Sequence, residues 1–225
     1  MSRLLINTYF AVPVQFFVVL GLTISMAFSA QASDLRLAVK DTKGRISQYA
    51  VVTLKPLFDD NWPTPIAHSP QMKQQGAMFT PFVMAVKVNT SVKFPNLDEF
   101  RHQVYSYSKA KKFKLRLYGK DESKEVAFDK VGIISLGCNI HDNMLAYISV
   151  TDAPYFVVTD SAGFAEILNV RPGKYQLSIW HPNQKNRKQN FTQPITIATD
   201  DVVMNATLEL RRVGRKQKPP EDDNY

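Results

Sequence analysis

Short runs in which apolar and polar residues alternate follow one another along most of the chain, separated by Gly, Pro, Asn and Asp. Alternation with a period of two is typical of β-strands that bury one face. No segment shows the apolar spacing of an amphipathic helix. We therefore expect an all-β protein of antiparallel sandwiches rather than a parallel α/β sheet. The strands are expected at residues 35–39, 48–54, 82–88, 91–95, 102–107, 112–118, 133–136, 145–150, 174–180 and 202–210.

The N-terminus has the pattern of a secretory signal. Arg3 precedes a mostly apolar stretch over residues 9–28, and Ala30-Gln31-Ala32 follows it as a small-residue cleavage site. We expect cleavage after Ala32 and export to the periplasm. An uncleaved anchor is the alternative, and only in that case would the protein associate with a membrane.

Two patterns indicate a second module. Residues 159–164 and 170–177 resemble the second half of a small transthyretin- or carboxypeptidase-regulatory-like β-sandwich, and residues 39–44 and 50–54 supply the turn and strands of a first half. The alternative is that the early strands belong to the central module. Lys55 to Gly76 is rich in proline and predicts a connection.

The resulting division has six parts. We expect a signal peptide (1–32), N-terminal strands that could complete the second sandwich (33–58), a linker (59–71), a central domain (72–150), a regulatory-like β-sandwich (151–210) and a disordered charged tail (211–225).

Composition narrows the function. Apolar residues make up 44% and charged residues 21% of the chain, which is ordinary for a globular protein. The net charge of +8 is compatible with nucleic acid, but we expect no nucleic-acid partner for an exported protein. We find no Ser-His-Asp grouping, phosphate-binding glycine loop or paired carboxylates, and four histidines are too few for a trinuclear copper cluster. We therefore expect a protein that is not an enzyme.

The most informative motif is Cys138-x2-His141-x2-Met144, which contains the only cysteine in the chain. A blue copper site uses two imidazoles and one thiolate, with a weak axial methionine. We expect the second imidazole from His102, because His68 lies among prolines and His181 lies far downstream in another segment. Singly, a Cys or a Met is more often a core residue. Zinc competes for the same donors but has no use for a thioether.

These residues carry a family resemblance. The motif Cys138-x2-His141-x2-Met144, together with Phe94-Pro95-Asn96-x-Asp98 and His102-x-Val104-Tyr105-Ser106, resembles the cupredoxin superfamily. It is most similar to the plastocyanin- and amicyanin-like periplasmic proteins of the methylamine utilization type. The sequence departs from many of these relatives at Gln103, where a second histidine would stand.

The resemblance implies a Greek-key β-sandwich holding one type 1 copper ion on His102, Cys138, His141 and Met144. It implies a single-electron carrier between periplasmic redox partners, and the alternative is a copper-binding or copper-delivery protein. We expect the ring of His141, on the ligand loop, to expose an edge through which electrons leave.

A basic segment suggests a docking site for an acidic redox partner. Apolar residues at 113, 115 and 117 alternate with basic ones, so one face of an expected strand is core and the other cationic. The alternative is a solvated outer face of a sheet. The docking candidates are Lys109, Lys111, Lys112, Lys114 and Arg116.

Overall fold

The computed structural model describes residues 32–59, 70–186 and 190–211. The expected signal segment up to residue 31, most of the expected linker and nearly all of the expected tail lie outside these residues. Within them the chain forms 16 strands and no helix, which confirms the all-β prediction. None of the described segments is a helix with the length and apolar character needed to span a membrane.

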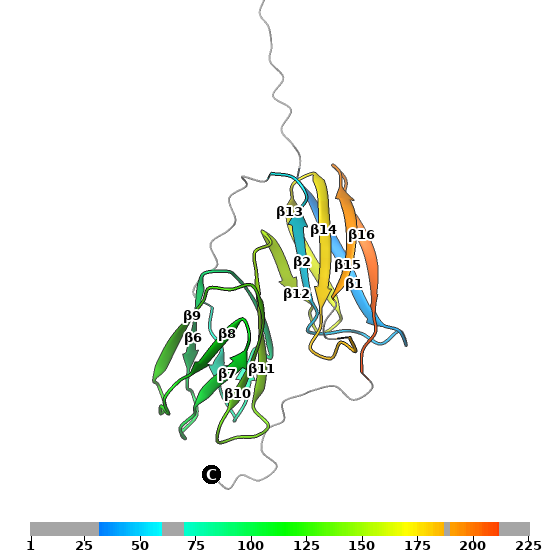
Figure 1. Ribbon diagram of the computed structural model, residues 1–225. Coiled ribbons are helices and arrows are strands. Elements are labelled where there is room, and N and C mark those ends of the chain that lie inside the picture. The colour runs from blue at the N-terminus through cyan, green and yellow to red at the C-terminus, as the bar shows by residue number, and fades with distance from the viewer. Residues whose placement is uncertain (1–31, 60–69, 187–189, 212–225) are drawn as a thin grey trace, which may run out of the picture.

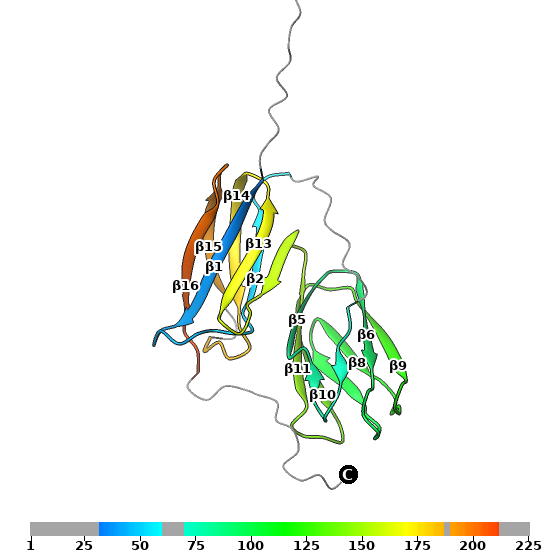
Figure 2. The same ribbon diagram turned by 180° about the vertical axis from the view of Figure 1, so that it is seen from behind.

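The strands form two β-sandwiches that lie side by side (Figures 1 and 2). In the first sandwich, one sheet has the order β5-β11-β10-β7-β8, and the opposite layer contains the pairs β6-β9 and β3-β4. Its strands are β3 (Lys73–Gln74), β4 (Phe79–Thr80), β5 (Val83–Lys87), β6 (Thr90–Pro95), β7 (Val104–Ser108), β8 (Lys111–Lys114), β9 (Ser123–Phe128), β10 (Gly132–Cys138) and β11 (Leu145–Thr151).

Strand β10 shows how the sequence places its side chains. Successive residues of a strand point to opposite faces, so residues two apart share one face. Ile134, Leu136 and Cys138 are buried in the first sandwich, whereas Ser135 and Gly137 between them are only partly buried. Cys138 therefore enters the interior because it continues the apolar face of β10.

The second sandwich contains strands from both ends of the described chain. One sheet has the order β13-β1-β16 and the other β12-β2-β14-β15, so β1 and β2 each lie between strands that follow the first sandwich in sequence. Its strands are β1 (Ser33–Asp41), β2 (Val51–Pro56), β12 (Tyr155–Val158), β13 (Phe164–Val170), β14 (Gly173–Trp180), β15 (Phe191–Ile197) and β16 (Val202–Leu208).

A small apolar cluster joins the two sandwiches. The ring of Tyr147 in β11 packs against Trp180 of β14, with ring centroids 5.6 Å apart. The ring centroid of Phe82 lies 5.7 Å from that of Tyr147. Val51 and Val83 are buried in the same cluster. Strands of both sandwiches thus share a continuous apolar contact.

The structure differs from the sequence-based expectation in three ways. Each sandwich contains a parallel pair, β5 with β11 and β1 with β16, so the sheets are mixed rather than purely antiparallel. The strand expected at 112–118 ends at Lys114 as β8. Six strands were not expected from the sequence. One of them is β15, which was missed because Pro194 lies within it. The proline is tolerated there because β15 lies at the edge of its sheet. The others are β3, β4, β9, β12 and β13.

Candidate metal centre

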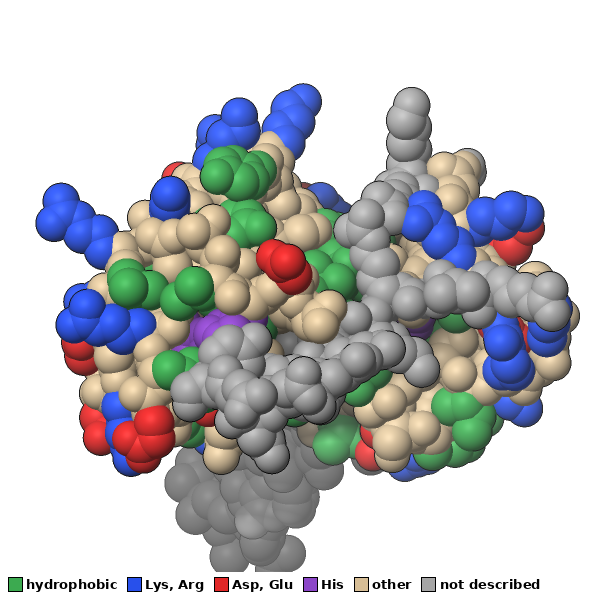
Figure 3. Space-filling model, turned by 90° about the horizontal axis from the view of Figure 1, so that it is seen from below, with side chains coloured by type: hydrophobic (Ala, Val, Ile, Leu, Met, Phe, Trp, Pro, Cys, Tyr) green, Lys and Arg blue, Asp and Glu red, His purple; other side chains and the backbone are tan. Residues whose placement is uncertain are grey.

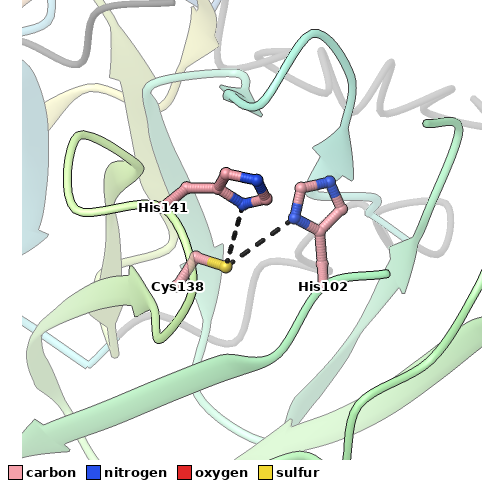
Figure 4. A group of neighbouring side chains, drawn as sticks. All are labelled: His102, Cys138 and His141. Carbon is pink, nitrogen blue, oxygen red and sulfur yellow. Dashed lines mark hydrogen bonds between the residues drawn. The ribbon is translucent and has the colours of Figure 1, made fainter. Parts of the chain in front are cut away.

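Three of the expected ligands meet at one end of the first sandwich. Cys138 is the last residue of β10, His141 lies in the loop between β10 and β11, and His102 precedes β7 by two residues. A bridge to Tyr118, with backbone hydrogen bonds of 3.0 Å in both directions, fixes the backbone of His102. Figure 4 shows both imidazoles turning Nδ1 toward the Cys138 sulfur.

The spacing of these atoms suits a bound transition-metal ion. The Cys138 Sγ atom lies 3.7 Å from Nδ1 of His102 and 3.6 Å from Nδ1 of His141. All three donor atoms lie within 4.8 Å of one another. An ion at about 2.0–2.3 Å from each donor, as in zinc sites with His and Cys ligands, requires sulfur–nitrogen separations of about 3.6–3.8 Å. The residues therefore fit a metal with little rearrangement.

The site is nearly closed to water. The exposed fractions are 0% for His102, 4% for Cys138 and 7% for His141. Phe100 packs on both imidazoles, with its ring centroid 5.1 Å from each. Figure 3, which faces this end of the molecule, shows histidine atoms at the surface between hydrophobic side chains. His141 is therefore the more accessible imidazole, although only a small part of it reaches solvent.

The thiol and its neighbouring imidazole favour their charged forms. Burial raises the pKa of Cys138, but hydrogen bonds from His102, from the backbone of Gln103 and Ile140, and from His141 outweigh it and lower this pKa to about 6. Burial also lowers the pKa of His102, and its contacts with Cys138 and Asp98 reverse the direction, so the pKa is raised. Thiolate is the form that binds metal.

Met144 is the last residue of the loop between β10 and β11. Its backbone N–H donates to the His141 carbonyl at 3.0 Å, which closes a turn between the two residues. Met144 is 2% exposed and shares the apolar core with Cys138. The role expected for Met144 as an axial ligand stays a prediction.

Two residues of this end were missed by sequence reasoning. Phe100, which covers both imidazoles, gave no signal beyond being apolar. Asp98 lies within the segment that carries the family resemblance, and its Oδ2 atom lies 2.8 Å from Nε2 of His102. An acidic residue four positions before a histidine ligand could have been recognised, because metal-bound imidazoles commonly donate to a carboxylate.

His181, the other histidine among the described residues, does not join the site. His181 is buried in the second sandwich, where Nε2 donates to the Gln48 carbonyl at 2.9 Å and Nδ1 accepts from the Asn183 N–H at 3.0 Å. These bonds give it a structural role. His68 lies outside the described residues.

The basic segment is only partly as expected. Lys112 and Lys114 are exposed on β8, directly opposite Tyr107 and Tyr105 of β7. Lys109 and Arg116 are also exposed. Lys111 is partly buried and pairs with Asp129 at 3.0 Å, so it is the least available to a partner. Leu117 is 46% exposed rather than core, because the chain leaves the sheet after β8.

Beside these tyrosines the surface is hollowed. The hollow has a volume of about 430 Å³ and lies between β7, β10 and the ligand loop. The ring of Tyr105 packs so closely on Gly137 that an added Cβ there would lie 2.8 Å from it. Tyr105 and Tyr107 stack with centroids 5.2 Å apart, and Tyr107 is 73% exposed. An aromatic surface thus lies next to the residue preceding Cys138.

Comparisons with known proteins give partial matches. The family model of polysaccharide lyase family 4, domain II, matches residues 128–203, which is less than half of the chain and runs through both sandwiches. No curated protein matches the chain.

Among solved structures, the chain is similar to a copper-containing nitrite reductase from Thermus scotoductus SA-01, with 24% identity and a TM-score of 0.36 over 43% of this chain and 25% of that one. A purple cupredoxin from Nitrosopumilus maritimus shows 20% identity and a TM-score of 0.33 over 36% of this chain and 99% of that one. A reduced Cu(I) form of an amicyanin mutant shows 15% identity and a TM-score of 0.35 over 44% of this chain and 99% of that one.

The lowered pKa of Cys138 can be measured directly, since the chain has no other thiol. In the metal-free protein, ultraviolet thiolate absorbance should rise with pH around a midpoint of about 6. The group is a thiol below this value and a thiolate above it. His102→Ala should raise the midpoint, because it removes the strongest contact that favours the thiolate. A midpoint near the ordinary value of about 8.5 in the unaltered protein would contradict the geometry.

Proposed function

We propose that the chain is an exported mononuclear copper protein of the cupredoxin type, which carries single electrons and holds the ion with His102, Cys138, His141 and Met144. The observation that supports this proposal most directly is the convergence of one thiolate and two imidazole nitrogens within 4.8 Å in a buried site. A thiolate with two imidazoles and a nearby methionine is the donor set of blue copper.

The protein's part in this function is to hold the donors in one arrangement. A bound copper ion would supply the one-electron redox couple. Cys138 is fixed at the end of β10 and His102 by its bridge to Tyr118, while the turn between His141 and Met144 limits movement of the loop. Phe100 and the buried surroundings exclude water from the donors. A rigid and dry site limits reorganisation when an electron arrives or leaves.

Export and an electron-carrying role fit the single cysteine. A free thiol in an oxidising compartment is open to intermolecular pairing, and ligation of Cys138 would protect it. The composition supports a carrier rather than an oxidase, because four histidines do not suffice for a trinuclear cluster in addition to this site.

We propose that a redox partner docks on the cationic, aromatic surface of β7 and β8. Lys112 and Lys114 stand opposite the stacked tyrosines, beside the hollow that reaches the ligand loop. Positive charge at this place would attract an acidic redox protein and raise its association rate.

Copper binding and redox cycling should be visible in optical and EPR spectra. One equivalent of Cu(II) should give an intense thiolate-to-copper charge-transfer band, which ascorbate bleaches and re-oxidation restores with the metal retained. Cys138→Ser should abolish the band and leave the far-ultraviolet circular dichroism unchanged, because serine keeps the strand and removes the sulfur. Release of the ion on reduction would instead favour copper delivery, and absence of the band would contradict the proposal.

The docking surface can be tested with an anionic electron donor of defined charge, hexacyanoferrate(II). Lys112→Glu with Lys114→Glu should slow reduction of the Cu(II) protein several-fold at low ionic strength, and added salt should remove most of the difference. A matched control is Lys43→Glu with Lys174→Glu, since both lysines are exposed in the second sandwich. Equal slowing by the control pair, or no slowing by the test pair, would contradict this assignment.

A further inference from the structure

The carboxylate of Asp98 is buried and surrounded by donors. It is 8% exposed, Oδ1 accepts the Gly76 N–H at 2.6 Å, and Oδ2 accepts the Ala77 N–H at 3.0 Å. Its other contact is Nε2 of His102, 2.8 Å from Oδ2. Burial raises the pKa of Asp98, but the hydrogen bonds from His102, Ala77 and Gly76 outweigh it and lower the pKa. Asp98 is therefore a buried anion in contact with a metal-binding imidazole.

The two backbone donors come from an unusual hairpin turn. Gln75 and Met78 exchange backbone hydrogen bonds of 3.0 and 3.2 Å, which leaves Gly76 and Ala77 as the two central residues between β3 and β4. Their φ values are +62° and +50°. Positive φ at both central positions defines a type I′ turn, in which a non-glycine residue costs roughly 1–2 kcal/mol.

The conformation of this turn lets its backbone bind the Asp98 carboxylate. Both central N–H groups converge on one carboxylate, as in the backbone concavities that bind anions. The hairpin over residues 73–80 thus neutralises part of the charge of Asp98 and holds it in place. Without Asp98, the buried Ala77 N–H would lose the partner that the structure gives it.

The segment between Asp98 and His102 is braced as well. The Asn96 side chain accepts the Asp98 N–H at 2.9 Å and donates to the carbonyls of Phe100 at 2.9 Å and Tyr118 at 3.2 Å. Asn96 is fully buried. Asn96 therefore fixes the loop that carries Asp98 and His102.

We infer that Asp98, held by the 73–80 hairpin, is a positioning residue that fixes the imidazole of His102 and tunes the metal's reduction potential. The effect on the reduction potential rests on the proposed copper function, whereas the orientation of the His102 imidazole does not depend on it. A carboxylate at Nε2 keeps a proton on that nitrogen and turns Nδ1 toward the Cys138 sulfur. Without metal, Nδ1–H donates to the thiolate, and the Nδ1 lone pair would bind an ion once that proton has left. The carboxylate also makes the imidazole a stronger donor, which stabilises Cu(II) more than Cu(I).

The orientation is tested in the metal-free protein, so that it stands apart from copper binding. Proton NMR should show a hydrogen-bonded Nε2–H signal of His102 that exchanges slowly with water. Asp98→Asn, which preserves shape and removes charge, should weaken or remove this protection. Far-ultraviolet circular dichroism and thermal unfolding report whether the variant is folded, and Asp98→Glu supplies a second variant that keeps the charge.

The potential is tested on the copper-loaded protein. Outer contacts of this kind change metal affinity by about 10- to 100-fold. If Asp98→Asn weakens Cu(II) binding tenfold relative to Cu(I), the reduction potential rises by about 59 mV. The reduction potential of Asp98→Glu should lie between those of the unaltered protein and Asp98→Asn. Glutamate keeps the negative charge, but its longer side chain places the carboxylate differently relative to His102.

The matched control is Glu99→Gln. This change removes the same charge one residue away, but Glu99 is 81% exposed and pairs with Lys120 at the surface. It should leave both the Nε2–H signal and the potential nearly unchanged. An equal rise of the potential in Glu99→Gln would show a general charge effect and overturn the inference. A folded Asp98→Asn protein with an unchanged Nε2–H signal would overturn it as well, whether or not copper binds.

Discussion

The arrangement depends on a buried thiolate between two imidazoles. A charged sulfur in a site as closed as this one is unfavourable unless other groups compensate for lost hydration. The compensation comes from His102, His141 and backbone N–H groups, which together lower the pKa of Cys138 to about 6 despite burial. A metal ion on the same donors would replace protons with a stronger positive charge. The same contacts that make the thiolate tolerable therefore prepare the residues for a metal.

The fold brings these three donors together from different structural elements. Cys138 follows the apolar face of β10, His141 is carried by the loop that leads to β11, and His102 is placed by its bridge to Tyr118. Phe100 then covers both imidazoles. The second sandwich lies outside this site, yet its contact through Trp180 and Tyr147 reaches β11, the strand that ends the ligand loop.

Local sequence was sufficient for the parts of the site that are close along the chain. The spacing of Cys138, His141 and Met144 could be recognised directly, and His102 followed from the small number of histidines. The all-β class followed from alternation. Asp98 was not assigned a role, because its function depends on the Gly76–Ala77 turn, which no local pattern indicated. Strand β9 was missed because its first three residues, Ser123 to Glu125, are all polar and exposed, so only its second half alternates. Strand β8 ends at Lys114. Beyond it, the chain keeps the bond from the Leu115 N–H to the Val104 carbonyl and the bridge of Tyr118 to His102.

The proposed function requires that copper bonds one thiolate and two imidazoles in this chain. X-ray absorption at the copper edge, on protein loaded with one equivalent of the metal, measures the donor atoms directly. The geometry predicts one short copper–sulfur bond and two imidazole nitrogens per copper, with the sulfur contribution absent in Cys138→Ser. Copper bonded only to nitrogen and oxygen in the unaltered protein would show that Cys138 does not bind the metal.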